Sequence, residues 1–285
     1  MTVESGPPSR PAPLRQAIDF SDLAPRAASA LVLVAVAVGT AVSGGRPFAA
    51  LWWLAALAIH WEWQRLIGSG RDPGRLVFGA LTIALAALAA PYGNSGWSLL
   101  LLAAGAVAAG WSGRGHRLMA GFGVIYAGSL PLALGLLRGS EARGLEAVFW
   151  LFAVVWGTDV MAYFGGRLVG GPKLWRRISP SKTWSGFLIG IGAGAVAGLA
   201  VSLAWGANWR LLPLGAAAGI VAQAGDLFES VLKRRFGVKD SSGLIPGHGG
   251  VMDRLDGFLA AAVFAAGFGL LRSGAGEAAA GLMQW

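Results

Sequence analysis

Nine long apolar runs dominate the sequence and limit what the chain can fold into. Each is about 17–22 residues long, close to the length a helix needs to cross about 30 Å of hydrocarbon. Lipid cannot hydrogen-bond exposed backbone groups, so continuous runs of this kind are expected to be helices. The sequence therefore predicts an all-α fold, a polytopic integral membrane helical bundle with about nine transmembrane helices. The predicted spans are 27–44, 47–66, 75–92, 96–112, 117–137, 145–165, 184–205, 210–230 and 256–272.

The composition agrees with a chain built for the bilayer. Charged residues make up 13% of the 285 positions, hydrophobic residues make up 55%, and the mean hydropathy is +0.60. Soluble domains carry about a quarter charged residues. The 45 glycines favour closely packed helices, and the absence of cysteine excludes disulfides and thiolate chemistry. The net charge of +9 is carried mostly by short loops, so we expect no nucleic-acid binding.

The distribution of positive charge predicts the orientation of the chain. With the N-terminus in the cytosol, 18 of the 23 Lys and Arg residues fall in cytosolic segments, as the positive-inside rule requires. Residues 1–26 are polar and proline-rich and are interpreted as a disordered cytosolic tail, and residues 27–285 as one transmembrane domain. No convincing signal-peptidase site follows the first run, so we expect a multi-pass protein of the cell (plasma or inner) membrane.

Most residues able to carry chemistry lie in the second half of this domain, about 145–272. The eighth span, the loop after it and the start of the ninth span contain four aspartates among several cationic side chains: Asp226, Asp240, Asp253 and Asp256, with Lys233, Arg234, Lys239 and Arg254. Aspartate is costly in an apolar run unless water, a cation or a partner compensates it. Carboxylate oxygens suit Mg²⁺, and the cations suit phosphate oxygens. The PGHGG turn would let backbone N–H groups approach an anion; an ion-paired loop is the alternative.

A second polar group follows the sixth span. Asp159, Tyr163 and Arg167 recur at four-residue spacing, so they share a helical face at its cytosolic end. Several cations come next, including Lys182. Ser179–Thr183 is predicted to begin the seventh helix, which would offer hydroxyl groups and a helix N-terminus to an anion. A loop that is basic only for topological reasons is the alternative.

The first five spans contain few polar residues apart from His60 and Glu62, near the cytosolic end of the second span. A position at the interface and a contribution to a headgroup or metal site both remain open for this pair. Zinc-protease, nucleophile-elbow, Walker and dinucleotide-binding patterns are absent. The residues themselves thus indicate a membrane-embedded, Mg²⁺-dependent site for polyphosphate and a lipid phosphate.

Residues 230–256 read S-V-L-K-R-x4-K-D-S-S-G-L-I-P-G-H-G-G-V-M-D-R-L-D. This long pattern of mixed residue types resembles the signature of phosphatidate cytidylyltransferases (CDP-diacylglycerol synthases). The GDLFES, WGTDVMAYFGGR and SPSKTW segments are similar to the same family, so the resemblance covers roughly the last 130 residues. The family more often has Lys where Ser181 stands and Glu where Ser185 stands, which puts in doubt any role that requires those side chains here.

The resemblance implies transfer of CMP from CTP to phosphatidic acid, giving CDP-diacylglycerol and pyrophosphate at the cytosolic face of the membrane. It implies Mg²⁺ as cofactor, with or without a second cation. The expected partners are CTP, phosphatidic acid and the lipid bilayer, and a homodimer is left open. One alternative is a CTP-dependent transferase or kinase that acts on another membrane lipid. A cation transporter is disfavoured because the charges cluster at one face and late in the chain.

The resemblance also assigns roles to particular residues. Asp226 and Asp253 are expected as the first metal ligands, with Asp256 and Asp240 as further ligands or neighbours of the ligands. The phosphates would be held by Lys233, Arg234, Lys239 and Arg254, while His248 would either donate to the pyrophosphate or pack within its turn. The remaining residues expected to contact CTP or the lipid headgroup are Asp159, Tyr163, Arg167, Ser179, Lys182, Thr183, Ser230, Gly249 and Gly250.

Overall fold

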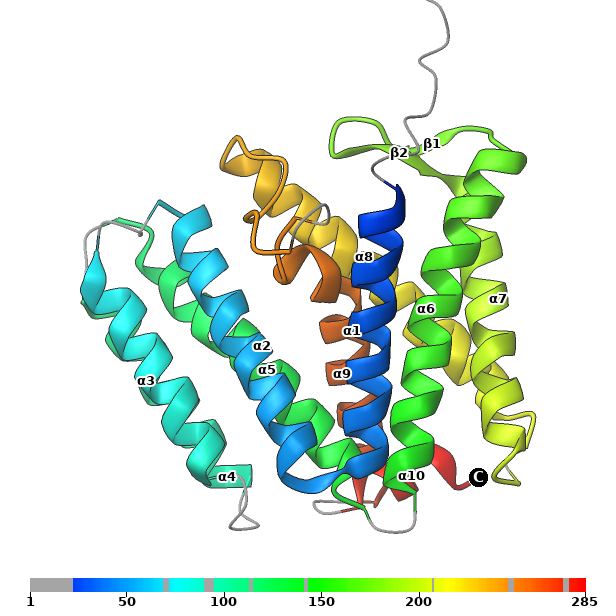
Figure 1. Ribbon diagram of the computed structural model, residues 1–285, viewed down its shortest axis with the longest axis horizontal. Helices are drawn as coiled ribbons and strands as arrows, with labels where there is room; N and C mark the ends of the chain where they lie inside the picture. Colours follow the sequence, from blue (N-terminus) through cyan, green and yellow to red (C-terminus); the bar gives the residue numbers. More distant parts are fainter. Residues whose placement is uncertain are drawn as a thin grey trace, which may run out of the picture.

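The computed structural model describes residues 23–68, 72–89, 95–112, 115–140, 143–206, 208–245, 249–273 and 277–285. Within them a helix occupies each of the nine ranges predicted as apolar spans (Figure 1). The helices are α1 (Leu23–Ser43), α2 (Gly45–Leu66), α3 (Pro73–Ala89), α4 (Ser95–Trp111), α5 (Arg117–Arg138), α6 (Gly144–Leu168), α7 (Trp184–Leu203), α8 (Leu211–Arg235) and α9 (Met252–Ser273). A short helix that the hydropathy pattern does not predict, α10 (Ala278–Met283), follows α9. Of the predicted tail, only residues 23–26 are described, and they belong to α1.

Five of the described helices, α5 to α9, are long and apolar enough to cross a membrane. The apolar part of α1 (Ser29–Ser43), α3 and the segment Gly96–Trp111 of α4 are apolar but shorter than the length expected of a full span. α2 has 22 residues but contains Arg46, Glu62 and Arg65. The helices therefore make this a helical membrane protein, while the predicted total of nine spans goes beyond what they establish.

Glycine allows α6 and α7 to pack most closely. Four glycines at four-residue spacing on α7 face α6: Gly186, Gly190, Gly194 and Gly198. A Cβ on Gly190 would lie 2.7 Å from the carbonyl oxygen of Thr158, and one on Gly194 would lie 2.6 Å from that of Val154. Any larger residue would push the two backbones apart. The glycine-rich composition thus produces close helix contact, which is how helices associate in lipid.

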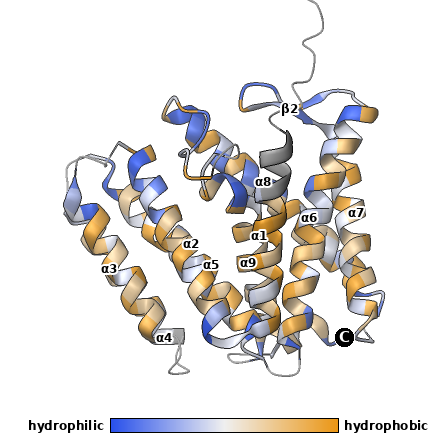
Figure 2. Cartoon of the chain, viewed as in Figure 1, coloured by the Kyte–Doolittle hydropathy of each residue, from blue (hydrophilic) through white to orange (hydrophobic). Residues whose placement is uncertain are grey.

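Large apolar side chains cover the outside of the bundle as well as its core. Leu31, Leu88 and Leu118 are among many that are exposed, whereas Trp63 and Trp150 are completely buried. Figure 2 shows hydrophobic residues along the lengths of the helices and hydrophilic ones gathered mainly at the end that carries the α8–α9 loop. Water would penalise such an exterior, but lipid solvates it. The side-chain pattern therefore fits immersion in a bilayer.

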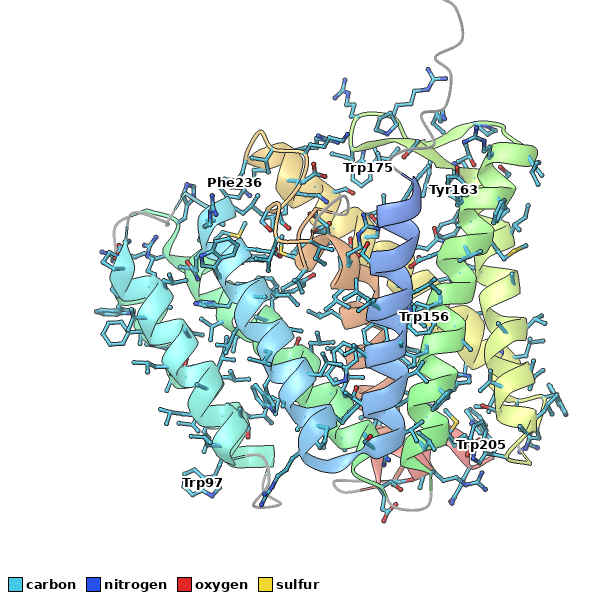
Figure 3. The ribbon with its side chains drawn as sticks, viewed as in Figure 1. Trp97, Trp156, Tyr163, Trp175, Trp205 and Phe236 are labelled. Carbon is cyan, nitrogen blue, oxygen red and sulfur yellow. The ribbon has the colours of Figure 1, made fainter. Side chains whose placement is uncertain are left out.

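Aromatic side chains mark both ends of the bundle. Figure 3 shows Tyr163, Trp175 and Phe236 toward one end, Trp97 and Trp205 toward the other. Their rings are amphipathic or apolar, and such residues concentrate where hydrocarbon meets headgroups. Aromatic residues at both ends of apolar helices are typical of a membrane-spanning bundle, although Trp156 lies between the two ends.

A small antiparallel hairpin replaces the predicted start of the seventh helix. Its strands are β1 (Lys173–Trp175) and β2 (Ser179–Thr183), paired so that Lys173 faces Thr183. The prediction that Ser179–Thr183 begins a helix is wrong, because these residues pair as a strand with Lys173–Trp175. α7 begins at Trp184 instead, with the Thr183 hydroxyl accepting a hydrogen bond from the Gly186 N–H at 3.2 Å. The all-α prediction is confirmed for the bundle, and this two-stranded hairpin is the sheet beside it in the described residues.

Candidate active site

The two polar segments singled out from the sequence meet at one end of the bundle. Lys182, on β2, places its Nζ 2.5 Å from Oδ2 of Asp226, on α8. Asp159, on α6, interacts electrostatically with Asp226, Lys182 and Arg254. Ser230, one turn after Asp226, lies with its hydroxyl 3.5 Å from Oδ1 of that carboxylate. Three helices and the hairpin therefore contribute to one cluster of opposite charges.

Lys233 connects α8 to α9 within this cluster. Its Nζ lies 2.7 Å from Oε2 of Glu229, one turn earlier on α8, and 2.6 Å from Oδ1 of Asp253 on α9. The carboxyl groups of Asp256 and Glu229 lie beside each other, and Asp256 also lies within electrostatic range of Asp226. Glu229 is buried and was not among the predicted site residues. Its four-residue spacing from Lys233 was the signal that could have revealed it.

The Asp253 carboxylate organises the loop between α8 and α9. Its Oδ2 accepts hydrogen bonds from the backbone N–H of Gly250 at 2.7 Å and from the N–H and hydroxyl of Ser241, both at 2.9 Å. Gly249, with φ of +81°, turns the backbone toward this carboxylate, and a Cβ there would lie 2.8 Å from Oδ2. A Cβ on Gly250 would overlap Ser241 Oγ. The two glycines are thus needed for the close approach of the loop to Asp253.

Glu62, on α2, is completely buried and faces the same loop. Its carboxylate accepts hydrogen bonds from the Ser242 hydroxyl at 2.5 Å and from the backbone N–H groups of Val251 and Met252 at 2.9 and 2.6 Å. Of the two roles left open for this residue, the geometry favours a contribution to the site rather than exposure at the interface. His60, two residues earlier on α2, instead packs against Gly79 of α3.

Other predicted site residues lie around this centre. Arg167 donates a hydrogen bond to the Tyr163 hydroxyl at 2.9 Å, and both side chains are exposed. Arg234 reaches the carbonyl oxygens of Ile178, between the hairpin strands, and Val238, both at 3.4 Å.

The structure does not bring every predicted residue to the carboxylate cluster. Lys239 and Asp240 are exposed in the loop. Ser179 and Thr183 belong to the hairpin, where Thr183 caps α7. His248 lies outside the described residues.

Carboxylates dominate the centre of the site. Among the described residues, no group of three or more His, Asp or Glu side chains stands in a ready arrangement for a metal ion. Asp159 and Asp256 nevertheless both lie within electrostatic range of Asp226. Oxygen donors of this type suit a hard cation such as Mg²⁺, and the neighbouring Lys and Arg side chains suit phosphate.

The fold and the site define a helical membrane protein with carboxylates and amines gathered at one end of its bundle, an arrangement suited to phosphate chemistry. The chain belongs to the cytidylyltransferase family, whose model matches residues 24–271. The match therefore covers nearly all of the described helical bundle.

Curated relatives agree with this membership. A phosphatidate cytidylyltransferase of Brucella abortus is 38% identical over 264 residues, which cover 88% of this chain and 95% of the relative, and that of Brucella suis matches equally well. A phosphatidate cytidylyltransferase of Staphylococcus saprophyticus is 43% identical over 123 residues, or 42% of this chain and 47% of the relative. These matches confirm the resemblance stated from residues 230–256.

Proposed function

We propose that this protein transfers CMP from CTP to phosphatidic acid and forms CDP-diacylglycerol and pyrophosphate. One observation carries the proposal. The Lys182–Asp226 pair and the Lys233–Asp253 pair lie in one cluster, because Asp256 interacts electrostatically with both Asp226 and Lys233. It joins the two segments that resemble phosphatidate cytidylyltransferases into one site. Family membership and relatives that bear that name over 88% of the chain support the same substrates.

The reaction asks for positioning more than for acid–base chemistry. A phosphate oxygen of phosphatidic acid, already anionic near neutral pH, attacks the α-phosphorus of CTP. The bond from that phosphorus to the bridging oxygen breaks, and pyrophosphate leaves with the electron pair. The difficulty is to bring two polyanions together and to stabilise the charge that develops. Lys182, Lys233 and Arg254 are suited to this task because they lie beside the carboxylates, at the end of the helices where a lipid headgroup sits.

The carboxylates fit a divalent cation. We assign Asp226, Asp253 and Asp256 as the residues that would hold Mg²⁺, with Asp240 as a further ligand or a neighbour of one; a second cation would share this acidic cluster. The fit rests on the all-oxygen donor set and on the electrostatic repulsion between the Asp226 and Asp256 carboxylates, which a bound cation would relieve. Bound Mg²⁺ would neutralise charge on the triphosphate and the leaving pyrophosphate. Asp253 would then serve the cation and the loop together, since its oxygens also accept hydrogen bonds from Ser241 and Gly250.

The remaining predicted residues lie where substrates would approach. We place the triphosphate near Arg234 and Lys239, and the lipid headgroup near Arg167 and Tyr163, which lie exposed at the end of α6. His248 stays a proposed donor to pyrophosphate.

We also propose nine spans with the N-terminus and the active site on the cytosolic side of the cell membrane. Support comes from the 18 Lys and Arg residues that this orientation puts inside and from the hydrophilic end of the bundle in Figure 2. In this proposal the shorter apolar helices α1, α3 and α4 cross where the bilayer is locally thinned. CTP is available only on the cytosolic side, so this orientation also satisfies the reaction.

The test is a turnover assay with protein purified in detergent. Supplied with CTP, phosphatidic acid and Mg²⁺, the protein should release pyrophosphate and form CDP-diacylglycerol, and chelation of Mg²⁺ should stop both. A parallel arm with polyprenyl phosphate distinguishes the alternative lipid. Activity with the polyprenyl substrate alone, or no lipid-dependent release of pyrophosphate, would contradict the proposal.

A further inference from the structure

The Glu62 carboxylate holds a segment about 180 residues away in the sequence. It comes from α2, in the half of the chain that lacks the recognised motif, and it is 0% exposed. Oε1 accepts hydrogen bonds from the Ser242 hydroxyl at 2.5 Å and the Val251 N–H at 2.9 Å. Oε2 accepts one from the Met252 N–H at 2.6 Å and lies 3.3 Å from the Ser241 hydroxyl. Three donors thus converge on one buried carboxylate, with the Ser241 hydroxyl beside it.

Two of these donors belong to the start of α9. The first N–H groups of a helix have no partner within the helix, and a negative charge is favoured beside them. A residue close in sequence normally supplies the acceptor. Here Glu62 supplies it from another helix, so the position of the first turn of α9 depends on α2. That turn carries Asp253, and Asp256 follows one turn later.

Ser241 connects Glu62 directly to Asp253. Its hydroxyl lies between the two carboxylates, 2.9 Å from Asp253 Oδ2 and 3.3 Å from Glu62 Oε2. The space is filled completely, because a Cβ on Gly250 would overlap both Ser241 Oγ and Glu62 Oε1. Loss of the Glu62 charge would therefore loosen the loop on both sides of Asp253.

We infer that Glu62 is a positioning residue for the phosphate and cation end of the site. It acts through Ser241, Ser242 and the first amides of α9, and it touches neither substrate. The inference rests on the proposed CMP transfer. Groups that hold cation ligands in place typically affect activity by about 10-fold to 100-fold. Because the misplacement would affect charge stabilisation in the transition state, it should lower kcat more than it raises the KM for CTP.

Glu62→Gln tests the inference, because the amide keeps the size of the side chain but only one of its two terminal atoms can accept hydrogen bonds. We expect a kcat at saturating Mg²⁺ lower by about 10-fold to 100-fold. Glu146→Gln is the matched control. Glu146 is also buried, but it pairs with Arg143 near the start of α6, away from the site at the other end of that helix. Its variant should keep the wild-type kcat whatever it does to thermal stability.

Amide hydrogen exchange supplies a measurement that does not depend on turnover. In Glu62→Gln, peptides containing Val251 and Met252 should exchange about 10-fold faster than in wild type, and those peptides should be unchanged in Glu146→Gln. Unchanged exchange in Glu62→Gln would overturn the inference. So would faster exchange with a kcat within about twofold of wild type, since Glu62 would then serve only the fold. If wild type itself releases no pyrophosphate with phosphatidic acid, the proposed function fails, while the exchange data still decide whether Glu62 holds the loop.

Discussion

Asp226 is the residue on which the predicted site converges. Lys182 binds it from the hairpin, the Ser230 hydroxyl lies beside it, and Asp159 and Asp256 interact with it electrostatically. The Asp226 carboxylate thus has both positive and negative neighbours. It is suited to bind a cation in place of Lys182, which would leave the Lys182 ammonium group to bind phosphate. It is therefore the first position at which the proposed chemistry should fail.

Replacing Asp226 by Asn should reduce Mg²⁺-dependent CMP transfer by at least about 100-fold, because the neutral amide is a poor cation ligand and no longer balances Lys182. Membrane insertion should be unaffected, as judged by yield and gel filtration in detergent. Asp72→Asn is the control, since Asp72 lies before α3 and pairs only loosely with Arg75, at 3.9 Å. Near-normal turnover in Asp226→Asn would refute the ligand assignment.

The Gly250 position should tolerate no side chain at all. Gly250→Ala would drive a methyl group into Ser241 and Glu62, and overpacking of this kind costs about 1–3 kcal/mol. We expect the loop to move and the specific activity to fall by about 10-fold.

Gly243→Ala gives the comparison within the same loop. A Cβ there meets nothing within 4 Å, so its specific activity should match wild type. The test compares the specific activities of the two variants and of wild type, each assayed with the same amount of monodisperse protein. Equal activities would show that the close packing around Gly250 has no part in turnover.

Two glutamates show where prediction from single residues stops. Glu62 lies between Trp61 and Trp63 on α2, and its partners are about 180 residues away, so no spacing rule connects them. Glu229 lies within the GDLFES segment and was not among the predicted site residues, although its spacing from Lys233 indicates a pair on one helical face. Asp226, Asp253 and Lys182 were predictable because a charged side chain near an apolar span is costly unless water, a cation or a partner compensates it.

At the level of elements, hydropathy predicted most of the fold because lipid imposes a simple rule on the backbone. The predicted span 117–137 corresponds to α5 (Arg117–Arg138), and 145–165 to α6 (Gly144–Leu168). The hairpin escaped prediction because its two strands, of three and five residues, are too short and polar to show a period, and their pairing depends on contacts across the turn. α10 escaped because six residues carry too little hydropathy signal.

The α6–α7 interface makes a testable distinction between glycines of one helix. Gly194→Ala should destabilise the protein by about 1–3 kcal/mol, because its Cβ would lie 2.6 Å from the Val154 carbonyl oxygen. Gly192→Ala, on the exposed face, meets nothing within 4 Å and should be neutral or slightly stabilising, since glycine in a helix costs about 0.5–1 kcal/mol relative to alanine. Thermal unfolding in detergent measures both. A lower melting temperature for Gly192→Ala than for Gly194→Ala would contradict the packing.

At the scale of the whole molecule, the two halves of the chain form one functional unit. The motif resemblance covers only about the last 130 residues, yet the family model matches residues 24–271. Glu62 gives a physical reason for this extent, since α2 reaches the loop that carries Gly250 and leads into Asp253. α2 is thus part of what shapes the site rather than an anchor alone.

Orientation in the membrane is the last prediction at this scale. The chain has no cysteine, so single-cysteine variants can be labelled without background. Val238→Cys, in the α8–α9 loop, should react with an impermeant maleimide only after cells are permeabilised, because the proposed orientation puts this end, with 18 of the 23 Lys and Arg residues, in the cytosol. Arg210→Cys, exposed just before α8 at the opposite end, should react in intact cells. Both variants should retain CMP transfer, which verifies that the labelled protein is folded. The reverse labelling pattern would place the carboxylate cluster on the side that lacks CTP, and the proposed orientation and reaction could not both stand.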